Sequence, residues 1–184
     1  MDGNQNITKE DILFIRSVFK EIRENLMPFM KERNFQLSNP QLFTFLSYSP
    51  TALAIASDGT VDEKEMAALE KISRGVNVNS MVNLDLMQRM ALAQEPEDCI
   101  LNEEFNIRAG SELLNLCRNM EKYEQNFINA TKALLKFDHD PTREDSMTKS
   151  FVKMMDTIIE SNVSENKEEE KEKLKAIQKK MGIN

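Results

Sequence analysis

The sequence predicts an all-α protein, a compact antiparallel bundle of about six to eight helices. Glycine and proline, which interrupt helices, number only five each among 184 residues. Leu, Met, Glu and Lys are abundant, and all four are good helix formers. Apolar residues make up 40% of the chain and recur at helical spacing. The helices therefore have enough apolar surface to share a core.

The strongest helical pattern covers residues 8–34 and opens on Thr8 and Asp11, which are spaced as a capping box. Its apolar stripe consists of Ile12, Ile15, Phe19, Ile22, Leu26 and Phe29. We expect Pro28 to kink this helix or to end its regular part, because proline has no backbone N–H.

Three start signals follow this first helix. Asn39 with Pro40 is typical of an N-cap and a first helical position, and predicts a buried helix. Ser49 with Pro50 repeats the signal and predicts a second, short buried helix made of small residues. A further helix is expected to start near Asp62, with its apolar residues on one face.

The second half of the chain continues the helical pattern. Residues 81–94 predict a helix whose apolar stripe includes Met87, Met90 and Ala91. The sequence "EPEDC" breaks that helix, and residues 102–137 then form one long helical pattern.

The last strongly apolar helix is expected after the turn "DHDPT". Thr142 and Asp145 have capping-box spacing and predict its start. Its apolar residues are Met147, Phe151, Met154, Ile158 and Ile159.

The chain length favours a single helical domain over residues 1–162, with 163–184 as a charged C-terminal helix or tail. In the tail the acids come first and the bases last, which suits a helix macrodipole. Only Leu174, Ile177 and Met181 form an apolar stripe there. We therefore expect the tail to contribute little to the core, as a projecting or partner-dependent helix or as a partly disordered segment.

Charge and composition exclude some functions. The net charge of −7 argues against nucleic acid as a ligand, since phosphate binding needs a basic surface. The acidic residues gather near 58–65, 95–104 and 138–145, where they could attract cations or basic partners, or simply face solvent. No apolar run approaches the ~18 residues of a membrane span. Cys99 and Cys117 do not have metal-site spacing, and we expect free thiols in a cytoplasmic protein.

The segment "IASDGTVDEKEMAALEKI", residues 55–72, is the most informative motif. An EF-hand loop places oxygen ligands at positions 1, 3, 5, 7, 9 and 12, with glycine at position 6. With Gly59 at position 6, Asp58, Asp62 and Glu65 fall at positions 5, 9 and 12. The second half of the motif therefore fits a calcium loop.

The first half of the motif does not fit, because positions 1 and 3 are Ala54 and Ala56. A full EF-hand is therefore excluded. Asp62 and Glu65 also have the spacing of a capping-box-like helix start, which needs no metal. Two interpretations stay open. The segment is either a helix start alone or a weak calcium or magnesium site that uses Asp58, Asp62 and Glu65.

The segment 52–72 resembles the signature of TerB-like domains, named for tellurite-resistance proteins. Both have a small-residue helix, then Asp-Gly, a hydrophobic residue, acidic residues and a helix. The matching residues are Asp58, Gly59, Val61, Asp62 and Glu65. The resemblance implies a helical bundle over about 40–160 without known catalytic residues. It also implies an acidic metal site and a role in stress-linked or membrane-associated complexes.

The resemblance further implies a second, pseudo-symmetric copy of the motif. The sequence "LLKFDHDPTREDSM" lies where that copy is expected, so Asp138 and Asp140 are weaker candidate metal ligands. Pro141 and Arg143, however, stand where the free backbone and the glycine should be.

Enzyme signatures are missing from the sequence, and we expect neither catalytic nor cofactor-binding residues. His139 is the only histidine and is expected to be an exposed turn residue. Three hypotheses follow. The first is a non-enzymatic TerB-like protein that acts through contacts with an unidentified protein partner, tuned by a divalent ion. The second is an adaptor with no ion role that uses its Met-rich helices and charged tail. The third is a metal-dependent enzyme that uses the acidic clusters.

Overall fold

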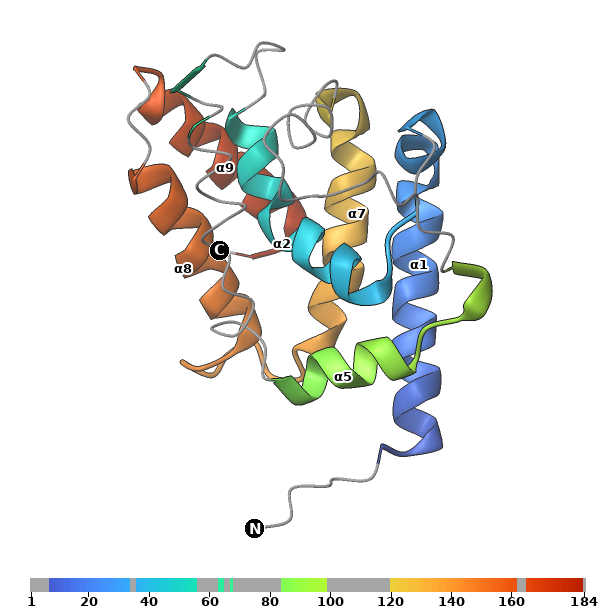
Figure 1. The fold of residues 1–184 in the computed structure, drawn as a ribbon. Coiled ribbons are helices and arrows are strands. Elements are labelled where there is room, and N and C mark those ends of the chain that lie inside the picture. Colours follow the sequence, from blue (N-terminus) through green and yellow to red (C-terminus); the bar gives the residue numbers. More distant parts are fainter. Residues whose placement is uncertain are drawn as a thin grey trace.

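The computed structural model describes residues 7–33, 36–55, 63–64, 67, 84–98, 120–161 and 165–183. These residues form six α-helices and three short 3-10 turns (Figure 1). The part of the chain that the structure describes contains no strand. The helices are α1 (Lys9–Arg33), α2 (Asn39–Ile55), α5 (Leu84–Leu92), α7 (Glu124–Leu134), α8 (Met147–Ser161) and α9 (Lys167–Met181). The 3-10 turns are η1 (Pro96–Asp98), η2 (Met120–Tyr123) and η3 (Leu135–Phe137). The all-α prediction is confirmed. Of the helix expected near Asp62, only residues 63–64 and 67 are described, and they are helical. The first part of the 102–137 pattern, up to residue 119, lies outside the described residues.

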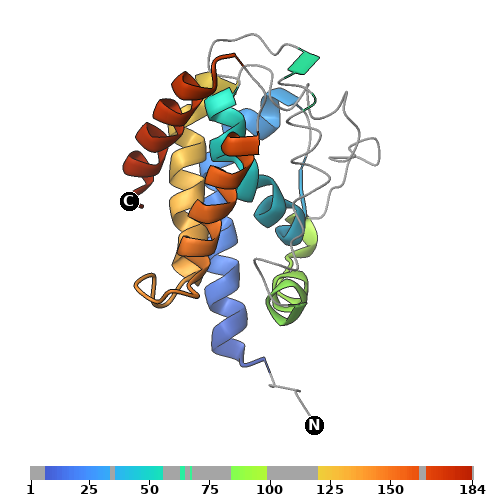
Figure 2. The ribbon, with the colours of Figure 1, turned by 90° about the vertical axis from the view of Figure 1, so that its left-hand side faces the viewer.

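The helices surround α2. Helices α7, α8 and α9 pack against it on one side, and α5 packs against it near the start of α1 (Figures 1 and 2). Helices α1 and α7 lie side by side and run antiparallel. Lys122 pairs with Glu32 near one end, and Lys136 pairs with Glu21 farther along. This pair of helices therefore has the antiparallel arrangement expected from the sequence.

Aromatic side chains from three helices meet in the core. The ring of Phe29 on α1 lies 4.8 Å from Phe127 on α7 and 5.9 Å from Phe45 on α2, measured between ring centroids. Phe45 and Phe127 are 5.6 Å apart, so the three rings contact one another. Each such aromatic pair contributes about 0.5–1.5 kcal/mol beyond its buried area. These rings hold α1, α2 and α7 together.

Helix α1 begins with the predicted capping box. The N–H of Thr8 donates to Asp11 Oδ2 at 3.0 Å, and the N–H of Asp11 donates to Thr8 Oγ1 at 3.1 Å. This reciprocal pair satisfies two N–H groups that a helix start otherwise leaves without partners. The helix continues through Pro28 to Arg33. Pro28 therefore does not end it.

The two helices predicted around Pro50 are in fact one helix, α2 (Asn39–Ile55). Pro50 cannot donate to the carbonyl of Leu46, which a regular helix would require. The hydroxyl of Ser49 donates to that carbonyl instead, at 3.0 Å. The buried carbonyl therefore keeps a partner, and the helix passes through the proline. The Ser-Pro pair is typical of a helix start, but here it lies inside a helix.

Helices α5 and α8 largely follow their predicted patterns. Met90 of α5 and Phe151 of α8 are buried, and "EPED" ends α5 as expected, with η1 after it. Ala91 was predicted to face the core but is exposed, while Ala93 is buried in its place. Among the described residues, no helix is long and apolar enough to span a membrane.

The prediction for the C-terminal tail is wrong in one respect. The tail contains the expected helix, α9, but this helix packs against α2, α7 and α8. Leu174, Ile177, Met181 and Ile183 are buried and belong to the same apolar cluster as the other helices. Their spacing gives a narrow stripe, and α2 offers an apolar surface for that stripe to cover. The tail therefore contributes to the core.

Candidate functional site

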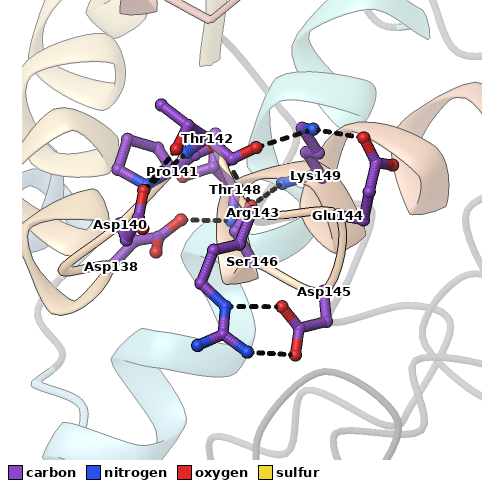
Figure 3. Close-up of polar contacts among 10 residues, drawn as sticks. All are labelled: Asp138, Asp140, Pro141, Thr142, Arg143, Glu144, Asp145, Ser146, Thr148 and Lys149. Atoms are coloured by element: carbon purple, nitrogen blue, oxygen red, sulfur yellow. Dashed lines mark hydrogen bonds and ion pairs between the residues drawn. The ribbon is translucent and has the colours of Figure 1, made fainter.

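The first acidic motif lies mostly outside the described residues, which include neither Asp58, Asp62 nor Glu65. Their role as metal ligands stays a prediction. Ala54, which stands at position 1 of the EF-hand alignment, is described and is fully buried in α2. The second acidic motif is described in full and forms the turn between η3 and α8 (Figure 3).

Asp138 caps helix α8 from ten residues away. The backbone N–H of Thr148 donates to Asp138 Oδ2 at 2.8 Å (Figure 3). Ser146 is the N-cap residue, because its hydroxyl accepts the N–H of Lys149 at 3.2 Å and its carbonyl accepts the N–H of Ser150 at 3.0 Å. The predicted Thr142–Asp145 capping box is therefore wrong. The N-cap of α8 is Ser146, four residues later than the Thr142 predicted from capping-box spacing.

Asp140 closes the turn around Pro141. Its Oδ1 accepts the backbone N–H of Thr142 at 3.2 Å and also the hydroxyl of Thr142. An aspartate that accepts the N–H two residues on forms an Asx-turn. This aspartate thus has a local structural role within the loop.

The remaining charges of the turn pair with each other. Arg143 donates from Nε and Nη2 to the two carboxylate oxygens of Asp145, both at 2.8 Å. This bidentate contact lowers the pKa of Asp145 and raises the pKa of Arg143. Lys149 contacts Glu144 at 2.9 Å and the carbonyl of Thr142 at 3.0 Å. The Arg143–Asp145 and Lys149–Glu144 pairs are largely exposed, so each contributes little to stability.

The acidic turn is therefore a helix-capping structure. Asp138 and Asp140, the weaker candidate ligands, each accept hydrogen bonds from the chain itself. No group of three or more His, Cys, Asp or Glu side chains suited to a metal ion occurs among the described residues. His139 is an exposed turn residue, as predicted, and its ring lies 6.1 Å from that of Phe14. The geometry therefore supports a structural role for this turn, which is to fix the start of α8.

A second candidate site was not anticipated from the sequence. Leu13 and Phe14 on α1 and Leu92 on α5 are 54%, 38% and 64% exposed, although all three are large and apolar. Leu92 is the last residue of α5, and the hydrogen bond from Arg16 to the carbonyl of Ala93 places the end of α5 beside the first turns of α1, which contain Leu13 and Phe14 (Figure 1). The ring of Phe14 also lies 5.8 Å from that of Phe137. We call this surface the α1–α5 corner. The helical register could have indicated it, because Leu13 and Phe14 fall off the inner stripe formed by Ile12 and Ile15.

Charged pairs fix the geometry of the α1–α5 corner. Arg16 donates from Nε to the carbonyl of Ala93 at 3.2 Å and contacts Glu95 at 2.6 Å. Arg89 contacts Asp11 at 3.6 Å. The pKa of Asp11 is lowered, chiefly by the hydrogen bond from the backbone of Thr8 and less by Arg89. These charges hold α5 against α1, while the apolar side chains stay in contact with solvent.

Comparison of the chain with family models, curated proteins and solved structures finds no match. The fold is an all-α helical bundle. The resemblance to TerB-like domains stays a prediction based on residues 52–72.

Proposed function

We propose that this chain is a non-catalytic helical-bundle protein that binds a protein partner through the α1–α5 corner. The observation that supports it is the exposure of Leu13, Phe14 and Leu92 on the two helix segments that meet through the Arg16–Ala93 hydrogen bond. Single exposed apolar residues are ordinary, whereas several in one region are typical of interaction sites. The TerB-like resemblance points the same way, toward a stress-linked or membrane-associated complex.

The composition of the corner suits a protein interface. Typical interfaces have an apolar centre and a polar rim. Here Arg16 is paired with Glu95, and Arg89 with Asp11 and Asp85, so these charges already have partners. Burial of apolar surface contributes about 25 cal/mol per Å². A partner that covers the leucines therefore gains free energy without breaking these ion pairs.

Affinity capture with purified variants tests this proposal. The test variant replaces Leu13 and Leu92 with Ser. The matched control is Met27→Ser, because Met27 is also on α1 and is 39% exposed, but lies about 21 Å along the helix from Leu13. We expect the wild type and the control to capture a partner that the double variant does not capture. When that partner is purified, it should bind the wild type in a direct titration.

Circular dichroism should show equal helix content in all three proteins, so that a lost partner cannot be attributed to unfolding. If both variants retain the same partners as the wild type, the corner is not the interface and the proposal is wrong.

A further inference from the structure

Helix α9 covers apolar surface on α2. Every residue of α2 from Phe45 to Ile55 is buried, so this helix has no solvent-exposed face over that length. Of the described helices, α5, α7, α8 and α9 pack around it, and α9 lies along the outside of the bundle (Figure 2). The stripe of Leu174, Ile177 and Met181 on α9, with Ile183 after it, is buried against these helices. We call the surface under α9 the α9 seat.

The edges of the α9 seat are acidic. Glu124 of α7 pairs with Lys180. Glu160 of α8 contacts Lys167 at 3.1 Å and Lys171 at 2.6 Å, and these lysines lower the pKa of its carboxyl group. The side-chain amide of Gln178 donates to Asp156 of α8 at 3.4 Å. The seat therefore combines an apolar floor with an acidic rim, which fits an amphipathic helix with basic residues along its edges.

Local interactions support α9 as a helix. Pairs within it join Lys171 to Glu168 at 3.2 Å and Lys173 to Glu169 at 2.8 Å. Its end is a Schellman motif, in which Gly182 has a φ of 78° and the N–H of Ile183 donates to the carbonyl of Gln178 at 3.1 Å. Because α9 follows all the other described helices in the chain, it can leave its seat without interrupting any connection between them.

We propose that α9 is an exchangeable cover, and that the partner of this protein supplies an amphipathic helix that takes its place. The ion pairs that hold α9 are partly exposed and each contributes little, so the four buried apolar side chains supply much of the attachment. Glu170 and Gln178 of α9 are buried as well. A partner helix with a longer apolar stripe and flanking lysines or arginines competes for the seat. This inference rests on the proposed function only in requiring a protein partner, and it uses a surface distinct from the α1–α5 corner.

The test uses the full-length protein with a released α9. Ile177→Asp places a charge on the buried stripe, and Ala176→Asp places the same charge on the exposed side of α9 as a matched control. The probe is a fluorescent synthetic peptide of residues 165–184. The peptide can bind only to molecules in which α9 has left its seat, so its apparent affinity is reduced in proportion to the fraction of such open molecules. We expect Ile177→Asp to bind the peptide at least about tenfold more tightly than the wild type or the control.

A peptide that carries Ile177→Asp itself should not bind, and added salt should weaken binding of the wild-type peptide. Thermal melting and hydrogen exchange decide the remaining outcomes. If Ile177→Asp loses its cooperative melt, or melts cooperatively but binds no peptide, α9 is an integral part of the core and the proposal is wrong. An exchangeable α9 should open more often than a core helix, so its amides should exchange faster than those of α7. The proposal is also wrong if, in the wild type, they exchange no faster. The capture experiment with Leu13 and Leu92 tests the proposed function separately, and its result does not depend on the peptide experiment.

Discussion

The hydroxyl of Ser49 replaces a missing backbone N–H in the middle of a buried helix. Pro50 cannot donate to the carbonyl of Leu46, and the hydroxyl of Ser49 does so at 3.0 Å. Ser49 is fully buried, so water cannot take over this role. A buried carbonyl without a partner is costly. The serine therefore allows α2 to remain one helix.

This geometry predicts coupling between positions 49 and 50. Ser49→Ala should lower the free energy of unfolding by about 1–3 kcal/mol, because it leaves the buried carbonyl of Leu46 without its donor. In a Pro50→Ala background the same change should cost much less, since the N–H of Ala at position 50 can donate to that carbonyl. Urea denaturation of the four proteins measures the coupling. An equal cost of Ser49→Ala in both backgrounds would contradict this account.

Asp138 is expected to matter for stability because it accepts the N–H of Thr148 at the start of α8. Asp138→Ala should lower the free energy of unfolding by about 0.5–2 kcal/mol, the usual cost of a lost cap. Asp140→Ala is the matched control, since Asp140 only closes an exposed turn. Chemical denaturation should separate the two variants. Similar costs for both would argue against the capping role.

The metal hypothesis for Asp58 has a direct test. If Asp58 binds calcium or magnesium together with Glu65, millimolar concentrations of the ion should raise the Tm of the wild type above its value in chelator. Asp58→Asn keeps the shape of the side chain but removes its charge, so the increase should shrink. A wild-type Tm that does not change with either ion would leave Asp62 and Glu65 as a helix start alone.

At the scale of elements, helical periodicity predicted α1, α5 and α8. It also predicted α7 as part of the longer 102–137 pattern, although the structure has the 3-10 turns η2 and η3 on either side of α7. It failed where a residue outside the local pattern decides the structure. The start of α8 depends on Asp138, which lies beyond the capping-box spacing. The docking of α9 depends on the apolar surface of α2, more than a hundred residues earlier. Such contacts between distant segments cannot be read from local spacing.

Gly182 ends α9 in the left-handed region, with a φ of 78°. An added Cβ would meet no other atom within 4 Å, so the cost of Gly182→Ala comes from the backbone alone. We expect it to lower the free energy of unfolding by about 1 kcal/mol. Gly182→Asn should cost less, because asparagine adopts this conformation more readily. Equal stability of Ala, Asn and Gly at this position in thermal melts would contradict the Schellman assignment.

At the scale of the whole molecule, the candidate sites were predicted less well than the fold. The sequence identified an acidic turn at 138–145, but only the structure shows that its carboxylates accept hydrogen bonds from the chain. The α1–α5 corner was missed, because the apolar residues of a helix were assigned to its core face. Exposure of Leu92 depends on how α5 lies against α1, which is a property of the assembled bundle.

Three carboxyl groups among the described residues have lowered pKa values, which gives the fold a pH-dependent contribution to stability in acid. Asp11, Asp145 and Glu160 lie in different elements, and hydrogen bonds to Thr8, Arg143 and Lys171 respectively are the main causes. A carboxyl group with a lowered pKa in the folded state stabilises the fold above its unfolded pKa, about 3.9 for Asp and 4.3 for Glu. That contribution is lost as the pH falls through the folded value.

The Tm should therefore fall as the pH is lowered below about 4. A variant in which Asp11, Asp145 and Glu160 are all replaced by Ala should have a lower Tm at neutral pH and a smaller decrease in acid. Thermal melts between about pH 2 and 7 compare the two proteins. Parallel curves for wild type and variant would show that other groups control the acid response.

The packing of α9 on α2 has a consequence for biosynthesis. Helix α2 is made early, and the helix that covers it is made after all the other described helices. At about 5–20 residues per second, translation of residues 56–166 takes roughly 6 to 22 s. Throughout that interval the nascent chain has no α9 to shield the apolar surface of α2. The protein is therefore expected to depend on chaperones during its synthesis, and to complete its core only after α9 has been made.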